Sequence, residues 1–316
     1  MRIVFMGTGE IALPAFRSLL GVPGWELVGL VTQPDKPVGR HQQELVAPRI
    51  KLEALAADIP VIQPERVKRR APLAWLAALA PDVVVVMAYG QRLPPELLEM
   101  PRLACINLHA SLLPRHRGAS CIPAAILAGD PQSGITVMHM SHGMDEGDII
   151  LRSAIPLAAT ETGGSLHDRL AALAPLALTE ALGLLGTGTA TRTTQDPAAA
   201  THAPKLDRGV GELAWSEPAE SLERRIRALD PWPGTFTTAP DSRGRPRRLK
   251  VFPATRVANG SADPGTMLAI TPDGIEVACG SGSLILTEVQ PDGGRRMPAT
   301  QAAHGARWSP GTRFGS

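Results

Sequence analysis

Short, almost wholly apolar segments alternate with longer amphipathic ones through the first 150 residues. The run Val83-Val-Val-Val86 is the most informative of them, because a strand that is apolar on both faces has to be buried on both faces. Such strands occur in parallel sheets that helices cover from either side. The pattern therefore predicts an α/β domain with a Rossmann-like, doubly wound parallel sheet.

The expected elements of this domain follow from the same pattern. Strands are predicted at residues 2–6, 26–32, 60–63, 82–88, 104–109, 134–140 and 148–155. Helices are predicted at residues 13–20, 46–57, 72–79, 94–100, 119–128 and 165–185. Ligands of doubly wound sheets bind beyond the carboxyl ends of the strands. Polar residues gather at those ends, in residues 7–10, 32–40, 89–92 and 107–118.

The composition and hydrophobic patterning of the sequence change after residue 187. Residues 188–206 are rich in Thr, Ala and Pro, and we interpret them as a linker. One helix is predicted beyond it, and short apolar runs between Gly and Pro turns follow at residues 249–257, 265–270, 274–278 and 283–289. This pattern predicts a small β-barrel or sandwich, with an OB-like barrel as the expected form. The expected domains are thus a Rossmann-like domain at residues 1–187 and a β-barrel at residues 207–316.

Three features of the sequence bear on the compartment. Cys105, Cys121 and Cys279 are too few for a disulfide framework and fit a reducing cytoplasm. The N-terminus has no charged leader before an apolar core and a cleavage site, so no secretory signal is expected. No apolar run approaches the roughly 18 residues of a membrane span, so no membrane association is expected.

Charge is nearly balanced, with 32 Lys+Arg against 30 Asp+Glu, which argues against a general cationic coat. The 5 Phe, 5 Trp and 1 Tyr are too few for a base-stacking platform. Cations nevertheless cluster after residue 206, at Arg243, Arg245, Arg247, Arg248 and Lys250, at Arg224, Arg225 and Arg227, and at Arg295 and Arg296. One such group is typical of a solvated surface, but three on one small domain indicate a face that binds phosphate.

The first strand runs into the turn Gly7-Thr-Gly9-Glu-Ile-Ala12, which satisfies the loose fingerprint of dinucleotide binders. Asp35 is then the candidate ribose ligand, although it lies in a loop and not at a strand end. Glycines at such a turn also serve close packing alone. A nicotinamide-dependent dehydrogenase is therefore one alternative function.

The segment from Asn107 to Gly118 offers different chemistry. Residues i and i+2 of a strand point to the same face, so Asn107 and His109 project together at a carboxyl end of the sheet. An amide stabilises an oxyanion, and an imidazole moves protons near neutral pH. Asp145 lies between two glycines, so its carboxylate could approach the imidazole closely. These three side chains suit acyl transfer.

Metal and covalent chemistry are weaker interpretations. His139, His142, Asp145 and Asp148 are spaced by threes, but a strand and a loop do not bring that spacing to one face. No zinc-type Cys pair is present, so no metal site is expected. Burial as inert thiols is the preferred interpretation of all three cysteines.

At these residues the chain resembles the folate-dependent formyltransferases. The resemblance lies in Asn-x-His, in Ser-Leu-Leu-Pro-x-x-Arg-Gly over residues 111–118, and in the Gly-Met-Asp-x-Gly-Asp run at residues 143–148. It extends to Thr32-Gln-Pro-Asp-Lys-Pro-Val-Gly-Arg40, to Val-Met-Ala-Tyr89-Gly90 and to Ile226-Arg-Ala-Leu-Asp-Pro-Trp-Pro-Gly234. These matches cover nearly the whole chain, the second domain included.

The resemblance implies an activity and a site. Asn107, His109 and Asp145 would be the catalytic residues, without a covalent intermediate or a metal. The first domain would hold 10-formyltetrahydrofolate, and the residues implied along the folate are Ser111, Leu112, Leu113 and Pro114. The formyl group would pass to the α-amino group of initiator methionyl-tRNA and give N-formylmethionyl-tRNA for translation initiation.

The resemblance also implies how the partner is held. The C-terminal barrel would support the tRNA, and the loop at residues 33–49 would contact its acceptor arm, mainly through Arg40. The family suggests a monomer. Two further alternatives remain, a formyltransferase acting on an amino sugar nucleotide and a non-enzymatic RNA-binding protein. The second would leave Asn107, His109 and Asp145 without a task.

Overall fold

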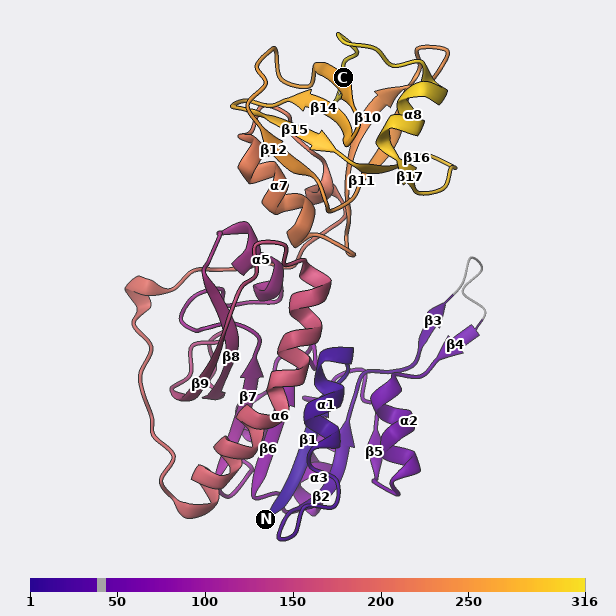
Figure 1. The fold of residues 1–316 in the computed structure, drawn as a ribbon. Helices are drawn as coiled ribbons and strands as arrows, with labels where there is room; N and C mark the ends of the chain where they lie inside the picture. Colours follow the sequence, from indigo (N-terminus) through magenta and orange to yellow (C-terminus); the bar gives the residue numbers. More distant parts are fainter. Residues whose placement is uncertain (39–43, 316) are drawn as a thin grey trace. The chain divides into compact units, whose positions relative to one another are not determined.

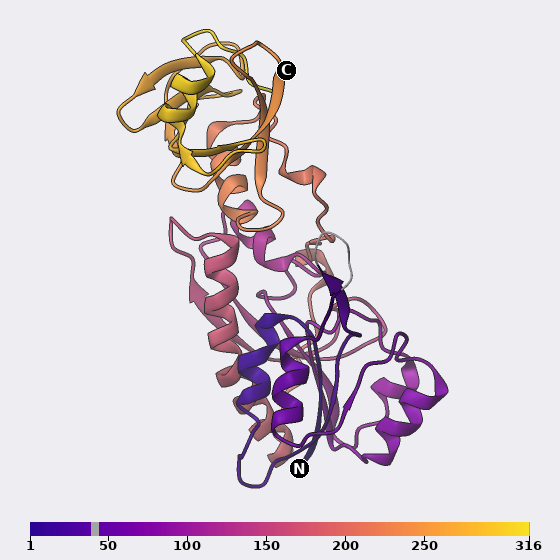
Figure 2. The ribbon, with the colours of Figure 1, turned by 90° about the vertical axis from the view of Figure 1, so that its right-hand side faces the viewer.

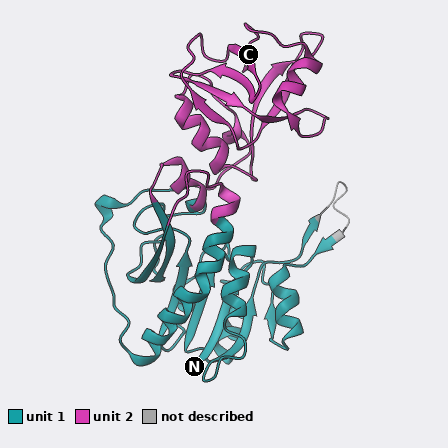
Figure 3. Cartoon of the chain, viewed as in Figure 1, with its two compact units in different colours: residues 1–121, 132–155, 167–203 teal, residues 122–131, 156–166, 204–316 magenta. Residues whose placement is uncertain are grey.

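The computed structural model describes residues 1–38 and 44–315, and it divides into two compact units (Figure 3). Unit 1 comprises residues 1–121, 132–155 and 167–203, and unit 2 comprises residues 122–131, 156–166 and 204–316. The predicted boundaries after residues 187 and 206 stay a prediction. Residues 188–203, interpreted above as linker, belong to unit 1.

Unit 1 is built on a seven-stranded sheet with the order β5-β2-β1-β6-β7-β8-β9 (Figure 1). Its strands are β1 Arg2–Gly7, β2 Glu26–Val31, β5 Val61–Ile62, β6 Val83–Met87, β7 Ala104–His109, β8 Gln132–His139 and β9 Ile149–Pro156. The first five strands of that order run parallel, whereas β7 and β8 pair antiparallel. The sheet is therefore mixed and not wholly parallel. Strand direction was not predictable from β8, because its residues 133–139 are as buried as those of a parallel strand.

Helices cover both faces of this sheet (Figure 2). They are α1 Leu13–Arg17, α2 Arg49–Ala56, α3 Arg70–Ala78, α4 Pro95–Leu98 and α6 Gly163–Thr187, while α5 Cys121–Leu127 falls almost wholly in unit 2. Alternate side chains of β1 pack on opposite faces of the sheet. Phe5 packs edge-on against Phe16 of α1, with ring centroids 5.6 Å apart. Val4 and Met6 belong to the core cluster that contains Leu76 of α3.

Tyr89 belongs to this core, two residues after the last residue of β6, and is 2% exposed. It is the only tyrosine of the chain. Its hydroxyl finds no hydrogen-bond partner within the described part of the chain. Burial therefore raises the pKa of the Tyr89 hydroxyl above its ordinary value.

Helix α6 differs from the sequence expectation about apolar runs. It has 25 residues, and its most apolar window has a mean hydropathy of 1.6, so by length and composition it is able to span a membrane. In the described chain, 44% of that window is buried, and core helices of soluble proteins meet the same criterion. The expectation of no sufficiently apolar segment does not hold for α6, and the absence of a membrane partner stays a prediction.

A two-stranded hairpin, β3 Lys36–Val38 and β4 Glu44–Val46, interrupts unit 1 between β2 and α2. It occupies the segment that was predicted as a loop at residues 33–49. Arg40 lies outside the described residues, so its predicted role stays a prediction. At the base of the hairpin, Lys51 Nζ lies 2.8 Å from Asp35 Oδ2.

Unit 2 contains two antiparallel sheets of four strands, with the orders β10-β11-β16-β17 and β12-β15-β14-β13. The first consists of β10 Thr235–Pro240, β11 Pro246–Val251, β16 Glu288–Pro291 and β17 Met297–Pro298. The second consists of β12 Arg256–Ala258, β13 Met267–Thr271, β14 Gly274–Ala278 and β15 Ser283–Leu286. The helices α7 Ala219–Ala228 and α8 Ala299–Ala306 also belong to unit 2.

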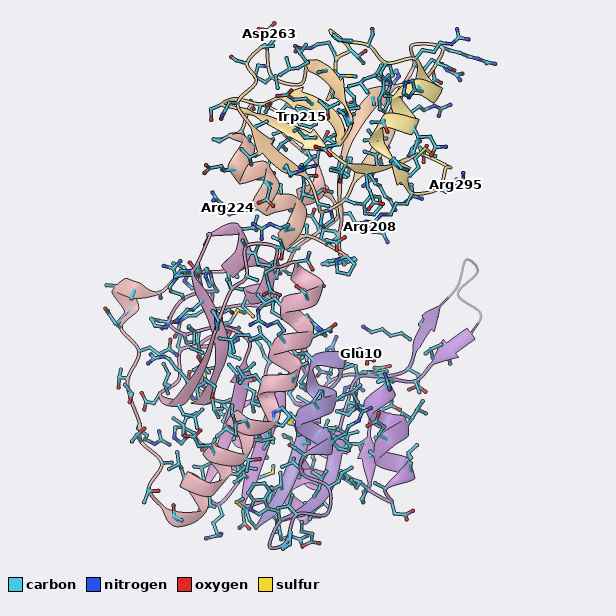
Figure 4. The ribbon with its side chains drawn as sticks, viewed as in Figure 1. Glu10, Arg208, Trp215, Arg224, Asp263 and Arg295 are labelled. Atoms are coloured by element: carbon cyan, nitrogen blue, oxygen red, sulfur yellow. The ribbon has the colours of Figure 1, made fainter. Side chains whose placement is uncertain are left out.

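Both sheets of unit 2 share one hydrophobic core, as the pattern of short apolar runs predicted. Trp215 lies inside this strand-rich region (Figure 4) and packs edge-on against Phe314 at 6.3 Å. Its indole Nε1 donates to Thr237 Oγ1 at 2.9 Å, so the buried polar atom is satisfied. The C-terminal part of the chain is thus an antiparallel β domain.

Candidate functional site

Strand β7 positions two of the predicted site residues. Asn107 pairs with Val86 of β6 on one side and with Met138 of β8 on the other, and His109 pairs with Thr136 of β8. The two side chains share a face because they are two residues apart on one strand. The Asn107 amide has no hydrogen-bond partner within the described ranges, 1–38 and 44–315, and the residue is only partly buried. It is therefore available to a ligand.

His109 is 6% exposed and faces polar groups on both sides of its ring. Its Nε2 lies 2.9 Å from the carbonyl oxygen of His116. Burial disfavours the imidazolium, but the Cys121 sulfur, the Asp145 carboxylate and the His116 carbonyl outweigh it and raise the pKa of His109 to about 9. These neighbours therefore favour the charged form of the ring.

Asp145 lies on the turn between β8 and β9. Its φ is 56°, in the left-handed region that a non-glycine residue enters only at a cost. The next glycine, Gly147, is required by space: a Cβ there would lie 1.7 Å from the His139 carbonyl oxygen. The loop thus packs closely against the end of β8, and the Asp145 side chain lies beside His109 at the end of β7.

Two polar groups lie close to the Asp145 carboxylate. Its Oδ2 accepts a hydrogen bond from the Gly118 N–H at 2.8 Å and lies 3.6 Å from His109 Nδ1. The second distance is too long for a hydrogen bond but short enough for a strong charge interaction in a site where the side chains are 17% and 7% exposed. The predicted approach of carboxylate and imidazole is present.

The predicted folate segment is mostly internal. Ser111 is 0% exposed and Leu113 is 1% exposed, whereas Leu112 and Pro114 are partly exposed. Thr136 ties the segment to β8, since its hydroxyl donates to the Ser111 carbonyl at 2.6 Å and accepts from the Leu113 N–H at 3.1 Å. Of these four residues, the side chains of Leu112 and Pro114 are the ones open to a ligand.

The features that suggested a dinucleotide have structural explanations. A Cβ on Gly7 would lie 2.8 Å from the Met87 carbonyl oxygen, so this glycine lets β1 approach β6. Asp35 is engaged by Lys51 and by Gln63, whose Nε2 donates to its Oδ1 at 2.6 Å. The hydrogen bond from Gln63 has the largest effect and the one from Lys51 adds to it, and together they hold the pKa of the Asp35 carboxyl below its usual value. Close packing is thus the better interpretation of the turn.

Metal-ligating side chains and thiols were the weaker candidates for chemistry. Within residues 1–38 and 44–315, no three His, Cys, Asp or Glu side chains gather closely enough to hold a metal ion. The three cysteines are free and buried. Burial raises the pKa of both the Cys105 and Cys279 thiols to about 12, so neither is a ready nucleophile.

The main basic group lies on and before β11. All five of its cations are exposed: Arg243, Arg245, Arg247, Arg248 and Lys250. Asp241 ion-pairs with Arg245 at 2.9 Å and approaches Arg247 at 3.8 Å. The Arg248 guanidinium stacks 3.5 Å from the centroid of the Phe236 ring. Arg295, labelled in Figure 4, precedes β17 of the same sheet.

Several residues around the trio Asn107, His109 and Asp145 were not proposed as site residues from the sequence. They are His116, Arg117 and Gly118 on the loop after β7, Cys121 at the start of α5, and Gln195 in the segment interpreted as linker. Apart from the His109–His116 contact, which joins residues seven positions apart, their contacts to the site are between residues distant in the sequence, and no local pattern predicts them. The Arg-Gly of the formyltransferase motif was the one available signal.

Comparison with known proteins extends these observations over the whole chain. A family model described as formyl transferase matches residues 1–182, and one described as formyl transferase, C-terminal domain, matches residues 205–307. A curated methionyl-tRNA formyltransferase of Akkermansia muciniphila is 50% identical over 306 residues, 96% of each chain. The chain belongs to the methionyl-tRNA formyltransferase family.

Further relatives decide between the alternatives within formyltransferases. The methionyl-tRNA formyltransferase of Pseudomonas paraeruginosa is 48% identical over 94% of this chain and 93% of its own. The sugar 3N-formyl transferase WlaRD, crystallised with dTDP and 5-N-formyl-THF, has a TM-score of 0.65 but 15% identity, covering 90% of this chain and 97% of that one. That likeness shows a shared fold. Family membership therefore favours methionyl-tRNA over an amino sugar nucleotide, and it excludes the nicotinamide-dependent interpretation.

Proposed function

We propose that this protein transfers the formyl group of 10-formyltetrahydrofolate to the α-amino group of initiator methionyl-tRNA, with Asn107, His109 and Asp145 as its catalytic residues. The observation that supports these roles most directly is the approach of Asp145 Oδ2 to His109 Nδ1, at 3.6 Å, beside the free amide of Asn107. An amide donor, a charged imidazole and a carboxylate are the groups that acyl transfer between nitrogens requires.

Asn107 acts on the formyl oxygen. The amino nitrogen attacks the formyl carbon, and negative charge develops on that oxygen as the carbon becomes tetrahedral. The Asn107 N–H donates to it, and loss of one such donor typically costs about 10²–10³ in rate. The attacking amine needs little activation, because a free α-amino group has a pKa near about 8.

His109 and Asp145 are responsible for the proton transfers. Two transfers are needed, one away from the attacking nitrogen and one to N10 of the folate as its bond to the formyl carbon breaks. In its charged form, which its neighbours favour, His109 can supply the proton to N10 and then accept the one released by the amine. Asp145 balances the charge of the ring throughout. The same charge also favours the oxyanion.

The exposed cations of β11 are proposed to contact the tRNA. Arg248 and Lys250 are two residues apart on one strand, so they project from the same face of the sheet, away from the buried Leu249. Phosphate contacts of this kind position a nucleic acid without reading its sequence. Arg243, Arg245 and Arg247 extend the group toward the preceding turn. Arg40 is proposed as a further contact.

Two properties of the working enzyme complete the proposal. Charged tRNA is made and used in the cytoplasm, so we place the protein there and away from membranes. We also expect it to act as a monomer, which gel filtration with light scattering would test.

One assay tests the function. Purified protein is mixed with 10-formyltetrahydrofolate and an acceptor, which is charged initiator tRNA, uncharged initiator tRNA or an amino sugar nucleotide. We expect N-formylmethionyl-tRNA from the first mixture and no product from the others. Formylation of the sugar nucleotide without formylation of methionyl-tRNA would reject the proposal.

A further inference from the structure

Gln195 reaches into the candidate site from the segment after α6. It is 5% exposed, and its Nε2 donates to two carbonyls of the Asp145 turn, those of Asp145 at 2.9 Å and Gly147 at 2.8 Å. A side-chain amide has two N–H donors, and here both are used on one loop. The amide therefore fixes the turn directly at the catalytic carboxylate.

Arg117 fixes the orientation of that amide. It is 7% exposed, and its Nε and Nη2 both donate to Gln195 Oε1, at 3.1 Å and 2.8 Å. The guanidinium holds the amide oxygen on its own side, so the amide nitrogen must face the turn. Arg117 Nη1 also lies 3.6 Å from Glu146 Oε1, which balances part of its buried charge.

Thr201, in the same segment as Gln195, holds the loop of His116 and Arg117 on the other side of the site. Thr201 accepts the Arg117 N–H on its carbonyl at 2.8 Å and the His116 N–H on its hydroxyl at 2.8 Å. The loop at residues 116–118, held in this way, supplies the two backbone groups that orient His109 and Asp145. They are the His116 carbonyl beside His109 and the Gly118 N–H that binds Asp145.

We propose that Gln195 and Arg117 are positioning residues for formyl transfer, which together set the Asp145 carboxylate against His109. The inference rests on the proposed function and adds two residues to it that touch neither substrate. Removing the Gln195 amide leaves two buried carbonyls and a buried guanidinium without their partner, so the turn must relax. A displacement of about 1 Å at a catalytic group can cost about 10²-fold in rate.

The test compares Gln195→Ala and Gln195→Met, of which the second keeps the side-chain volume and removes the donors. We expect kcat to fall about 10–10²-fold in both, while KM for either substrate changes little. Gln290→Ala is the matched control, because Gln290 also donates its amide to a carbonyl, that of Gly294 at 2.9 Å, but in unit 2. Its kcat should match wild type.

A double-mutant cycle separates positioning from general destabilisation. If Gln195 acts through Asp145, adding Gln195→Met to Asp145→Asn should lower kcat no further. Additive losses, or an unchanged kcat in Gln195→Met, would overturn the inference.

The titration of His109 in an NMR experiment needs no substrate. Its pKa should fall in Gln195→Met, because the carboxylate is no longer held near the ring. An unaltered pKa rejects the positioning role even where wild-type protein fails to formylate methionyl-tRNA, so the two failures are distinguishable.

Discussion

At the scale of single residues, the charge state of His109 decides what the site can do. The ring is buried, which alone would keep it neutral, yet its neighbours raise its pKa to about 9. Asp145 is the one recorded carboxylate within 4 Å of the ring in the described chain. A charged imidazole next to a carboxylate can donate a proton and regain one without leaving its place, as transfer between two nitrogens needs.

Asp145→Asn should remove the negative charge of this side chain while keeping its shape. The asparagine can still accept the Gly118 N–H, but it no longer balances the imidazolium, so the pKa of His109 falls. We expect kcat for formyl transfer to drop about 10²–10⁴-fold while folate still binds. Steady-state kinetics and a folate titration measure both. Asp168→Asn, at a carboxylate 84% exposed on α6, is the control and should retain wild-type kinetics.

The raised pKa of His109 also predicts how stability depends on pH. The folded protein binds the ring proton more tightly than the unfolded chain, whose histidine has an ordinary pKa of 6.5. The stabilisation is therefore complete below pH 6.5 and is lost as pH rises through about 9. Urea unfolding of wild type and His109→Gln should show a difference that shrinks over this interval, by up to about 3 kcal/mol. A difference that grows with pH would contradict the charged ring.

At the scale of elements, most strands and most helices were predictable because each is a local pattern. The strand with Asn107 and His109 was expected at residues 104–109 and is β7 Ala104–His109. The hairpin β3–β4, strand β10 Thr235–Pro240 and helix α8 Ala299–Ala306 were not predicted. Thr-rich and Ala-Gly-rich segments of this kind lack the apolar period that distinguishes a strand or a helix from a loop.

The site was predictable in part for the same reason. Asn107 and His109 are neighbours on one strand, and their shared face follows from strand geometry. Asp145 was selected because glycines flank it and because the formyltransferase motif includes it, since nothing local relates it to His109. Gln195 was hidden in a segment of linker-like composition, although its hydrogen bonds join it to residues 48 and 50 positions away. Long-range polar contacts are set by the fold and leave no periodic signal.

The turn between β8 and β9 is the element whose geometry should be most sensitive. Gly147→Ala forces a methyl group against the His139 carbonyl, so the turn must shift. We expect a loss of about 1–3 kcal/mol in unfolding free energy and a lower kcat. Gly183→Ala on α6 meets nothing within 4 Å and should stabilise the protein by about 0.5–1 kcal/mol. Equal melting temperatures for the two variants would refute this account of the turn.

At the scale of the whole molecule, catalysis and tRNA contact are expected to fall on separate parts of the chain. The trio belongs to unit 1, and the basic group of β11 belongs to unit 2. A chain with 32 Lys+Arg and 30 Asp+Glu gains no affinity for RNA from its total charge. Local placement of the cations must supply that affinity.

Salt dependence should reveal this placement. Replacing Arg248 and Lys250 by glutamine should weaken tRNA binding and reduce the slope of log Kd against log salt by about 0.7–0.9 for each phosphate that is no longer neutralised. Filter binding over a range of salt measures the slope. Lys68→Gln, an exposed lysine of unit 1, should leave it unchanged. An identical slope in the double variant would show that β11 does not touch the backbone of the tRNA.

The single tyrosine makes unit 1 optically distinct. Tyrosinate absorbs in the near ultraviolet where tyrosine does not, and in this chain such a signal can come from one position, Tyr89. Because that phenol is 2% exposed in the folded protein, it should ionise at alkaline pH only as its surroundings open. Ordinary absorbance spectroscopy, without any label, can therefore follow the melting of the catalytic half of the chain alone.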